Sequence, residues 1–290
     1  MAIDPISLCT TPVRLLKAQQ QVSLGTAFFF LRAEEEGARY VFLVTNYHVL
    51  TGHSPMETAS AVGDSISFYI HKSLESPGQV QQVIYPLFTQ DGNPLWLTNP
   101  RFPEADVALI PLAARILKDC YIQCIGQNWI DMPILLRPAT SVSMVGYPYG
   151  FHDTYNSLPI WKTGSLASEP ESDFQGKPLL LVDISSFRGM SGSPVFAVRH
   201  GAYETHEGKA AIGSARRFLG VFSAFQSISI KRYLEQLADT SRIGVISEEN
   251  LQLGYVWKAS ILSEVVAGFD AQAYEQTVFG RGVSLPPVIQ

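Results

Sequence analysis

The stretch "FRGMSGSPVF", from Phe187 to Phe196, sets Ser191 in a glycine-rich turn directly before an apolar run. A Gly-x-Ser-Gly sequence alone is compatible with a simple tight turn, because glycine, serine and proline collect in turns for steric reasons. The same arrangement also suits a nucleophilic serine, which needs a base to accept its proton and a third group to orient that base. The role of Ser191 therefore depends on the histidines and carboxylates that the rest of the chain supplies.

Short apolar runs dominate the chain on both sides of this turn. They are rich in Val, Ile, Phe and Tyr, and most are bounded by Gly, Pro, Asp or Asn, which is typical of strands. The runs are "GTAFFFL", "RYVFLVTN", "DSISFYI", "QVQQVIYPLF", "ADVALIPL", "SVSMVGYP", "PLLLVDI", "SPVFAV", "FLGVFSAF" and "LGYVWKAS". So many short strands without long helices between them predict a β-sandwich or β-barrels.

Helical periodicity is confined to two stretches. In residues 228–241, apolar residues recur at i, i+3, i+4 and i+7 and predict a helix: Ile230, Tyr233, Leu234 and Leu237. In residues 260–269 a second apolar stripe predicts a helix that ends at Gly268: Ile261, Leu262, Val265 and Val266.

The domain organisation follows from the less regular segments. "EEEGAR" predicts an exposed hairpin turn with Gly37 at the bend. Residues 112–140 are less strand-like, and we expect them to connect two β units. The sequence thus divides into residues 1–125, residues 126–268 and a C-terminal tail, residues 269–290, whose last part "GRGVSLPPVIQ" is expected to be extended.

Composition excludes several function classes. The 290 residues are 46% hydrophobic and 16% charged, which describes a protein with a sizeable core. A net charge of −5 argues against nucleic acid as the main partner, since phosphate binding needs concentrated Lys and Arg. The N-terminus lacks the apolar segment of a signal peptide, and no apolar run is long enough to span a bilayer. We therefore expect a cytoplasmic protein that does not enter membranes.

The cysteines do not predict a disulfide framework or a metal site. The chain has only Cys9, Cys120 and Cys124, too few for a disulfide scaffold. Cys120 and Cys124 have no Cys or His pair at zinc spacing nearby. We expect neither a metal nor another cofactor.

One histidine and two aspartates stand out as possible partners of Ser191. His48 follows the strongly apolar run "YVFLVT", where an imidazole is either a hydrogen-bonded core residue or a functional base. Asp106 opens the run "DVALIPL", where it is either a strand-entry cap or an orienting carboxylate, and Asp183 is its rival. The chain order His48, Asp106, Ser191 is that of the chymotrypsin-like double barrel, whereas α/β-hydrolases and subtilisins use other orders.

Six landmarks in the correct order carry a resemblance to a known family. They are "GTAFFF", "LVTNYHV", "DVALIPL", "VGYPYG…KTGSLAS", "DISSFRGMSGSPVF" and "LGVFSAF". From about Gly25 to about Ser260 the chain resembles the bacterial trypsin-like serine peptidases. The resemblance implies an all-β, chymotrypsin-like double six-stranded β-barrel with a few short helices, including one near the C-terminus. It also implies a serine endopeptidase that acts on a protein or peptide substrate.

The resemblance assigns the catalytic roles. His48 would take the proton of Ser191, Asp106 would hold the imidazole, and the N–H groups of Gly189 and Ser191 would form the oxyanion hole. Met190 stands where secreted digestive relatives have an aspartate that pairs with a new N-terminus after cleavage. We therefore expect activity without such processing, or control by a regulatory partner protein or by loop ordering.

The substrate-binding positions carry over less specifically. Ser185 would lie at the base of the primary pocket, and because it is not an acid, a preference for Lys or Arg is not expected. Ser223, Ala224 and Phe225 would pair with an extended substrate, and Phe225 would narrow the pocket in favour of small or medium apolar residues.

Three alternatives stay open at this stage. The tyrosine-rich stretch "GYPYGFHDTYNSLPIW" is either a lid or activation loop, or a packed surface loop. The whole chain could be a catalytically silent peptide-binding module on the same fold. It could also be an esterase, which shares the acyl chemistry and differs only in substrate.

Overall fold

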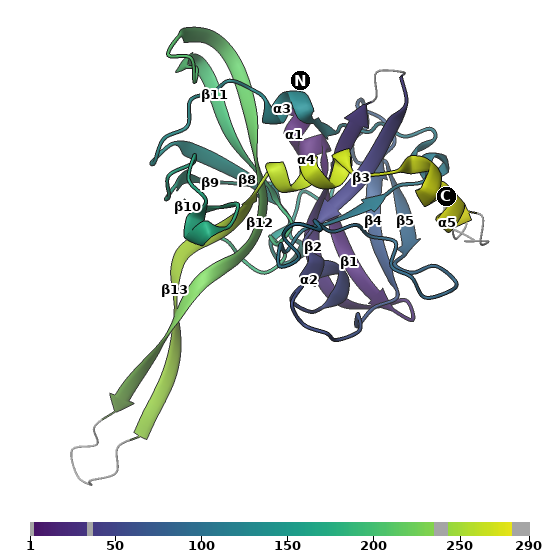
Figure 1. Cartoon of the computed structure of the whole chain (residues 1–290), viewed down its shortest axis with the longest axis horizontal. Coiled ribbons are helices and arrows are strands. Elements are labelled where there is room, and N and C mark those ends of the chain that lie inside the picture. The colour runs from purple at the N-terminus through teal and green to yellow at the C-terminus, as the bar shows by residue number, and fades with distance from the viewer. Residues whose placement is uncertain (1–2, 34–36, 235–242, 280–290) are drawn as a thin grey trace.

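The computed structural model describes residues 3–33, 37–234 and 243–279, and it consists of two β units side by side with few helices (Figure 1). In the described residues the N-terminal unit contains β1 (Thr10–Lys17), β2 (Gln20–Ala33), β3 (Arg39–Thr45), β4 (Ser65–His71), β5 (Val80–Pro86), β6 (Ala108–Pro111) and β7 (Ile125–Gly126). The C-terminal unit contains β8 (Ser141–Gly146), β9 (Ile160–Leu166), β10 (Leu179–Asp183), β11 (Pro194–Glu204), β12 (Ala210–Leu234) and β13 (Ile243–Lys258). The helices are short: α1 (Pro5–Leu8), α2 (Tyr47–Thr51), η1 (Ala114–Leu117), α3 (Gln127–Ile130), η2 (Pro148–Gly150), η3 (Phe174–Gly176), α4 (Ser260–Ala267) and α5 (Ala271–Phe279).

The N-terminal strands form an antiparallel sheet in the order β5-β4-β1-β2-β3-β6, to which the two-residue β7 adds in parallel beside β2. The chain between β5 and β6 bridges the two edges of this sheet. Leu97 pairs with Leu109 of β6, and the N–H of Leu95 donates to the carbonyl of Leu87, directly after β5. This segment therefore curls the six-stranded sheet into a barrel.

The C-terminal strands form a closed antiparallel barrel in the order β10-β13-β12-β11-β8-β9. Because the barrel is closed, each strand has a neighbour on both sides over part of its length, and a segment beyond the paired residues can still present a free edge. The predicted chymotrypsin-like double six-stranded barrel is thus confirmed by the topology of both units.

A long hairpin of β12 and β13 extends from the body of the molecule (Figure 1). Its register runs from Ser227 opposite Asn250 to Leu234 opposite Ile243. The prediction of a helix over residues 228–241 was therefore wrong for residues 228–234, and residues 235–241 lie outside the described chain. The physical reason is that pairing with β13 supplies the backbone hydrogen bonds, and the Ser-Ile-Ser-Ile alternation fits a strand as well as a helix.

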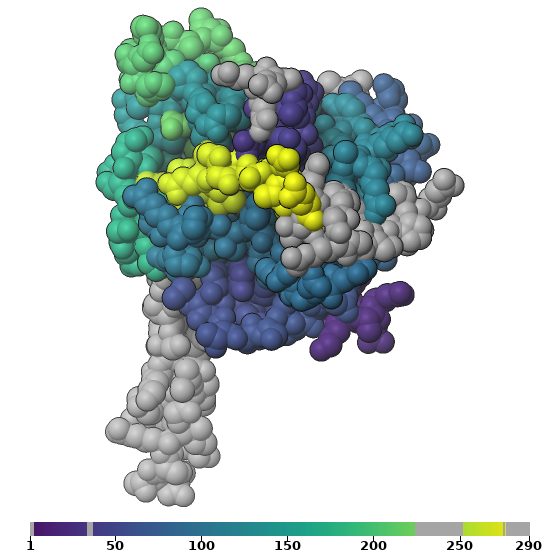
Figure 2. Space-filling model, turned by 45° about the vertical axis from the view of Figure 1, so that its right-hand side comes forward, coloured from purple at the N-terminus to yellow at the C-terminus, as the bar shows by residue number. Residues whose placement is uncertain are grey.

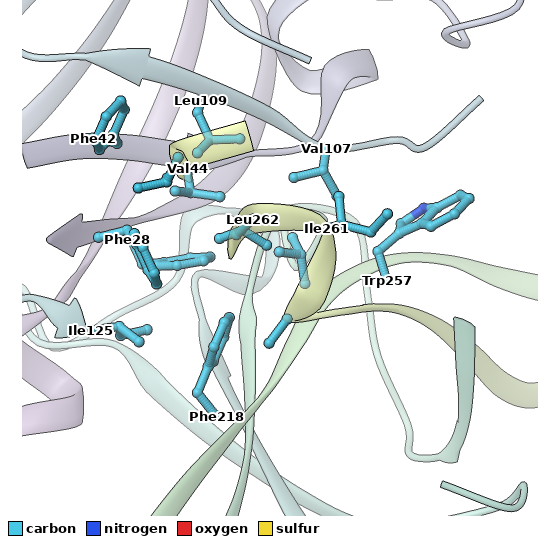
Figure 3. Packing of buried hydrophobic residues seen from close by; sticks show 14 of the residues in the cluster. Phe28, Phe42, Val44, Val107, Leu109, Ile125, Phe218, Trp257, Ile261 and Leu262 are labelled. Carbon is cyan, nitrogen blue, oxygen red and sulfur yellow. The ribbon is translucent and has the colours of Figure 1, made fainter. Parts of the chain in front are cut away.

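The two barrels share a hydrophobic core at their interface (Figure 3). Phe28 of the N-terminal barrel packs edge-on against Phe218 of the C-terminal barrel, with ring centroids 5.4 Å apart. Ile261 and Leu262 of α4 complete this cluster, and both are buried. Because the barrels meet through buried aromatic rings, the cleft between them has walls that are fixed relative to each other.

The C-terminal segment crosses from one barrel to the other (Figure 2). α4 is amphipathic as predicted and ends at Gly268, while α5 lies within the segment that the sequence assigned to a tail. The ring of Tyr274 in α5 packs on Phe269 at a centroid distance of 5.4 Å, and its hydroxyl donates to the carbonyl of Pro111 in β6. Residues 269–274 therefore form part of the packed structure. The last eleven residues, which the sequence predicts to be extended, lie outside the described chain.

A further prediction concerns the connection between β2 and β3. β2 and β3 form a hairpin with Ala33 opposite Arg39, and Gly37 has a φ of 89° as the predicted bend requires.

In the part of the chain that the structure describes, no helix has the length and apolar character to cross a bilayer.

Candidate active site

His48 lies in the first turn of α2, directly after β3. Asn46 precedes the helix in an extended conformation, with a φ of −78° and a ψ of 151°, and its side-chain amide donates to the backbone carbonyl of Asp106 at 2.6 Å. This bond ties the start of α2 to the approach of the neighbouring strand. This role of Asn46 was not predictable from a local stretch of sequence, because the bond joins residues sixty positions apart.

Asp106 reaches His48 because β3 and β6 are paired. Thr45, the last residue of β3, is opposite Ala108, the first residue of β6, so the residues that follow β3 and precede β6 lie side by side. The Nδ1 atom of His48 lies 2.6 Å from Oδ2 of Asp106, and the backbone N–H of His48 donates to Oδ1 at 3.0 Å. The rival carboxylate, Asp183, is an exposed residue at the end of β10 and does not line the cleft that contains His48.

The carboxylate of Asp106 accepts a third hydrogen bond, from the hydroxyl of Ser223 to Oδ2 at 2.5 Å. Burial on its own would raise the pKa of Asp106, but the hydrogen bonds from His48 and Ser223 together lower it below its usual value. Asp106 is therefore ionised at neutral pH although its side chain is only 13% exposed. A buried anion at Nδ1 favours the imidazole tautomer that carries its proton on Nδ1, which leaves Nε2 as an acceptor.

Ser191 lies in the loop that connects β10 to β11. Its hydroxyl donates to the backbone carbonyl of Ser223 at 3.2 Å, and its side chain is half-buried. Among the described residues, the imidazole of His48 hydrogen-bonds only to Asp106. His48 and Ser191 nevertheless line the same two hollows.

Two backbone N–H groups in this loop, those of Gly189 and Ser191, donate to no acceptor within the described part of the chain. The carbonyl of Arg188 accepts from the N–H of Tyr149 at 2.6 Å, and the carbonyl of Met190 accepts from the N–H of Ser193 at 3.0 Å. In a trans peptide the C=O and the following N–H point in opposite directions. The carbonyls of Arg188 and Met190 point toward the N–H groups that bind them. The N–H groups of Gly189 and Ser191, which directly follow these carbonyls, therefore point in the opposite directions.

Gly189 is required by the shape of this loop. Its φ is 93°, a conformation that residues with a side chain rarely adopt. A Cβ atom at this position would lie 2.5 Å from the carbonyl oxygen of Tyr147 and 2.9 Å from the nitrogen of Tyr149. The loop that holds Ser191 therefore packs directly against the turn at residues 147–149.

The tyrosine-rich loop is packed against the N-terminal barrel. The hydroxyl of Tyr69 in β4 donates to the carbonyl of Ser157 at 2.8 Å, and its oxygen lies 3.1 Å from the hydroxyl oxygen of Tyr147. The hydroxyl of Tyr147 donates in turn to the carbonyl of Thr10 at 3.2 Å. Burial raises the pKa of both tyrosines, so the two hydroxyls keep their protons and act as donors.

A cleft of about 670 Å³ contains His48, Asp106 and Ser191. Its apolar wall is formed by Leu179, Phe187, Phe222, Tyr255 and Trp257. Ser223, one of the residues that the sequence analysis expects to bind the substrate, is among the residues that line the cleft. Ser185 is exposed and is not among the residues that line it. For Ala224 and Phe225 the structure gives the backbone, in which Phe225 is paired with Gly254.

Solved structures with a similar fold include three serine proteases. The inactive form of the Rv3671c protease of M. tuberculosis has a TM-score of 0.43 and 14% identity, over 93% of this chain and 98% of that chain. The serine endoprotease from Yersinia pestis has a TM-score of 0.43 and 12% identity, over 95% and 65% of the respective chains. The thermostable serine protease AL20 from an extremophilic microorganism has a TM-score of 0.40 and 11% identity, over 74% and 93%.

No protein-family model matches the sequence, and no curated protein matches it. At the identities and TM-scores of the solved structures, the fold assignment rests on the strand order and register described above. The chain has the chymotrypsin-like double-barrel fold.

Proposed function

We propose that this chain is a serine endopeptidase that hydrolyses peptide bonds of a protein substrate through His48, Asp106 and Ser191. The observation that carries the proposal is that His48 and Ser191 line two neighbouring hollows, one together with Asp106 and the other together with Gly189. An anion-paired imidazole, a serine hydroxyl and two backbone N–H groups without acceptors in the described chain are thereby gathered in one region. Simple peptide binding requires no buried carboxylate behind the imidazole, which is why the arrangement favours catalysis.

The proposed reaction begins with attack of the Ser191 Oγ on the carbonyl carbon of the substrate, while Nε2 of His48 takes the hydroxyl proton. The negative charge that develops on the substrate oxygen is stabilised by the N–H groups of Gly189 and Ser191. The C–N bond then breaks as His48 returns the proton to the leaving amine. A water molecule attacks the resulting ester in the same way, with His48 as the base, and regenerates Ser191.

The free edge of β12 supports binding of an extended substrate. Pairing of β12 with β11 ends at Val221, opposite Pro194, while pairing with β13 continues past Phe225. The backbone from Ser223 to Phe225 therefore has one edge at which a substrate strand could add. The aromatic wall of the cleft fits an apolar side chain before the cleaved bond, and profiling with a peptide library tests this; strong cleavage after Lys or Arg would contradict it.

The enzyme is proposed to act without N-terminal processing. Met190 is fully buried and packs in the core of the C-terminal barrel, so the residue before the nucleophile has no charge to pair with a new N-terminus. Sequencing of the N-terminus of the active protein tests this proposal. An obligatory cleaved form would refute it.

A fluorophosphonate probe separates the enzyme from a silent binding module. We expect labelling of the wild type at Ser191, no labelling of Ser191→Ala, and labelling of the control Ser193→Ala. Ser193 is a suitable control because it lies two residues away, is fully buried, and contributes its backbone N–H rather than its side chain to the loop. Absence of labelling in the wild type would favour the binding module. Cleavage of simple esters without cleavage of any peptide in the library would favour the esterase.

A further inference from the structure

We infer that Thr26 is a positioning residue, whose hydroxyl holds the loop 187–191 in the conformation that directs the Gly189 N–H toward the hollow that Gly189 lines together with His48 and Ser191. The inference rests on the proposed function, because it concerns the oxyanion hole of the same site. Thr26 does not line the cleft, and its effect would act through the backbone of Gly189.

Thr26, in the N-terminal barrel, makes hydrogen bonds to three residues in and beside the Ser191 loop of the C-terminal barrel. Its hydroxyl donates to the carbonyl of Gly189 at 2.7 Å and accepts from the N–H of Tyr147 at 3.1 Å. Its own backbone N–H donates to the carbonyl of Ser191 at 2.8 Å. Thr26 is in β2 and is fully buried, so these bonds are shielded from water.

The bond to the Gly189 carbonyl fixes the orientation of the peptide that follows Gly189. The peptide that precedes it is fixed by the bond from the N–H of Tyr149 to the carbonyl of Arg188. Tyr149 itself has a φ of 51°, a conformation that is uncommon for a residue with a side chain. Gly189 is thus held at both of its peptide planes, and this matters because glycine offers little intrinsic resistance to a change of conformation.

Loss of the Thr26 hydroxyl would leave two buried backbone groups without a partner, the carbonyl of Gly189 and the N–H of Tyr147. An unsatisfied buried group costs about 1–3 kcal/mol. Rotation of the Gly189 peptides would relieve this cost, and it would turn the Gly189 N–H away from the substrate oxygen. The expected defect is therefore in the stabilisation of the oxyanion and not in substrate binding.

This role explains how the loop is ordered without a charged group at position 190. Met190 is buried among apolar side chains and makes no polar tether through its side chain. Thr26 supplies a neutral tether from the opposite barrel, and the carbonyl of Thr26 is itself fixed by the hydroxyl of Thr45 at 2.7 Å. Because β2 is an internal strand of the N-terminal barrel, the tether is present as soon as the two barrels have packed.

The test compares Thr26→Val and Thr26→Ala, which remove the hydroxyl, with Thr26→Ser, which keeps it. Thr11→Val is the matched control, because Thr11 is a fully buried threonine of the adjacent β1, opposite Ala27, and its hydroxyl accepts from the N–H of Tyr69. The readouts are kcat and KM on a fluorogenic peptide from the library, and affinity for a tripeptide aldehyde ending in leucinal. The aldehyde adds to the serine and forms the oxyanion, so its affinity reports on the oxyanion hole.

We expect Thr26→Val and Thr26→Ala to lower kcat by about 10²–10³, the effect of losing one oxyanion-hole donor, with little change in KM. Affinity for the aldehyde should fall by a similar factor, while Thr26→Ser and Thr11→Val stay within a few-fold of the wild type. If Thr26→Val does not fold, the comparison of Thr26→Ala with Thr26→Ser gives the same test.

A loss of kcat in Thr26→Ala no larger than in Thr26→Ser or Thr11→Val would overturn the inference. Unchanged aldehyde affinity in Thr26→Ala would also overturn it. In both cases fluorophosphonate labelling of the wild type at Ser191 would show that the proposed function survives. A wild type that is not labelled at Ser191 would instead refute the proposed function and the inference together.

Discussion

Replacement of Asp106 by asparagine tests whether the carboxylate sets the tautomer of His48. Two donors converge on Oδ2 of Asp106, Nδ1 of His48 and the Ser223 hydroxyl, while Oδ1 accepts the N–H of His48. Asparagine can offer an oxygen at only one of these positions. If its NH₂ group faces the N–H of His48, two buried donors oppose each other, which costs about 1–3 kcal/mol.

The opposite orientation of the asparagine satisfies every group but disables the base. Its oxygen then accepts from the N–H of His48, and its NH₂ group donates to Nδ1, while the Ser223 hydroxyl can turn to act as an acceptor. Nδ1 must be unprotonated in this arrangement, so the proton lies on Nε2 and His48 cannot take the proton of Ser191. The expected loss in kcat is about 10⁴-fold, which corresponds to about 5 kcal/mol of transition-state stabilisation.

Two measurements check this prediction. Steady-state kinetics on a library-derived peptide should show the loss in kcat, and ¹⁵N chemical shifts of the His48 ring should show the change from the Nδ1–H to the Nε2–H tautomer. Asp64→Asn is the matched control, because Asp64 is an exposed carboxylate that does not line the cleft and whose pKa is lowered by bonds from the Ala18 N–H and the Ser65 hydroxyl. Activity of Asp106→Asn within about threefold of the wild type, together with an unchanged tautomer, would refute the reasoning.

Three further outcomes are expected. Gly189→Ala should abolish fluorophosphonate labelling, because its Cβ would meet the carbonyl of Tyr147. The control Gly208→Ala, at a φ of 75° with open space around it, should label normally. Equal labelling of the two variants would contradict the backbone conformation required at Gly189. Ser223→Ala removes a bond that lowers the pKa of Asp106. A lowered pKa of Asp106 in the folded state stabilises the fold above the unfolded pKa of about 3.9, and this contribution is lost as the pH falls through the folded pKa. The midpoint of acid unfolding, followed by fluorescence, should therefore shift to higher pH in Ser223→Ala. An unchanged or lower midpoint would contradict the role of the Ser223 hydroxyl. Phe28→Ala should lower the free energy of unfolding in urea by about 3–5 kcal/mol, because the ring is fully buried between the barrels; a loss below about 1 kcal/mol would mean that this interface contributes little.

Most strands were predictable because a buried strand has a recognisable local pattern of apolar residues in the sequence. β1 was missed, since Pro12, Arg14 and Lys17 interrupt its apolar run, although Val13 and Leu15 are fully buried. The helix predicted over residues 228–234 failed for the opposite reason. Its local pattern was compatible with a helix, and the pairing that decides the matter joins it to residues 243–250, which a local window does not include.

The side chains of the candidate site were easier to predict than their supports. The order of His48, Asp106 and Ser191 along the chain indicated the three partners, and the pairing of β3 with β6 places the first two in contact. The sequence analysis expected the backbone of Ser223 to lie beside the substrate. It did not predict the hydrogen bond from the Ser223 hydroxyl to Asp106. Asn46 gave no signal either, because a buried amide that bonds a distant backbone carbonyl looks in sequence like any helix-capping asparagine.

The proposed oxyanion hole illustrates why residue identity alone does not establish a competent site. Its donors are backbone N–H groups, which every residue except proline possesses, so the motif "GMSGSP" states which residues are present and not how their peptides are oriented. In this chain the orientation is set by the Arg188 carbonyl on Tyr149 and by the Gly189 carbonyl on Thr26, a residue 163 positions earlier in the sequence. A chain with the same motif but no donor at position 26 would lose a restraint on its Gly189 peptides while its three side chains stayed in place. Prediction of activity from such a motif therefore has to include the remote groups that hold the loop.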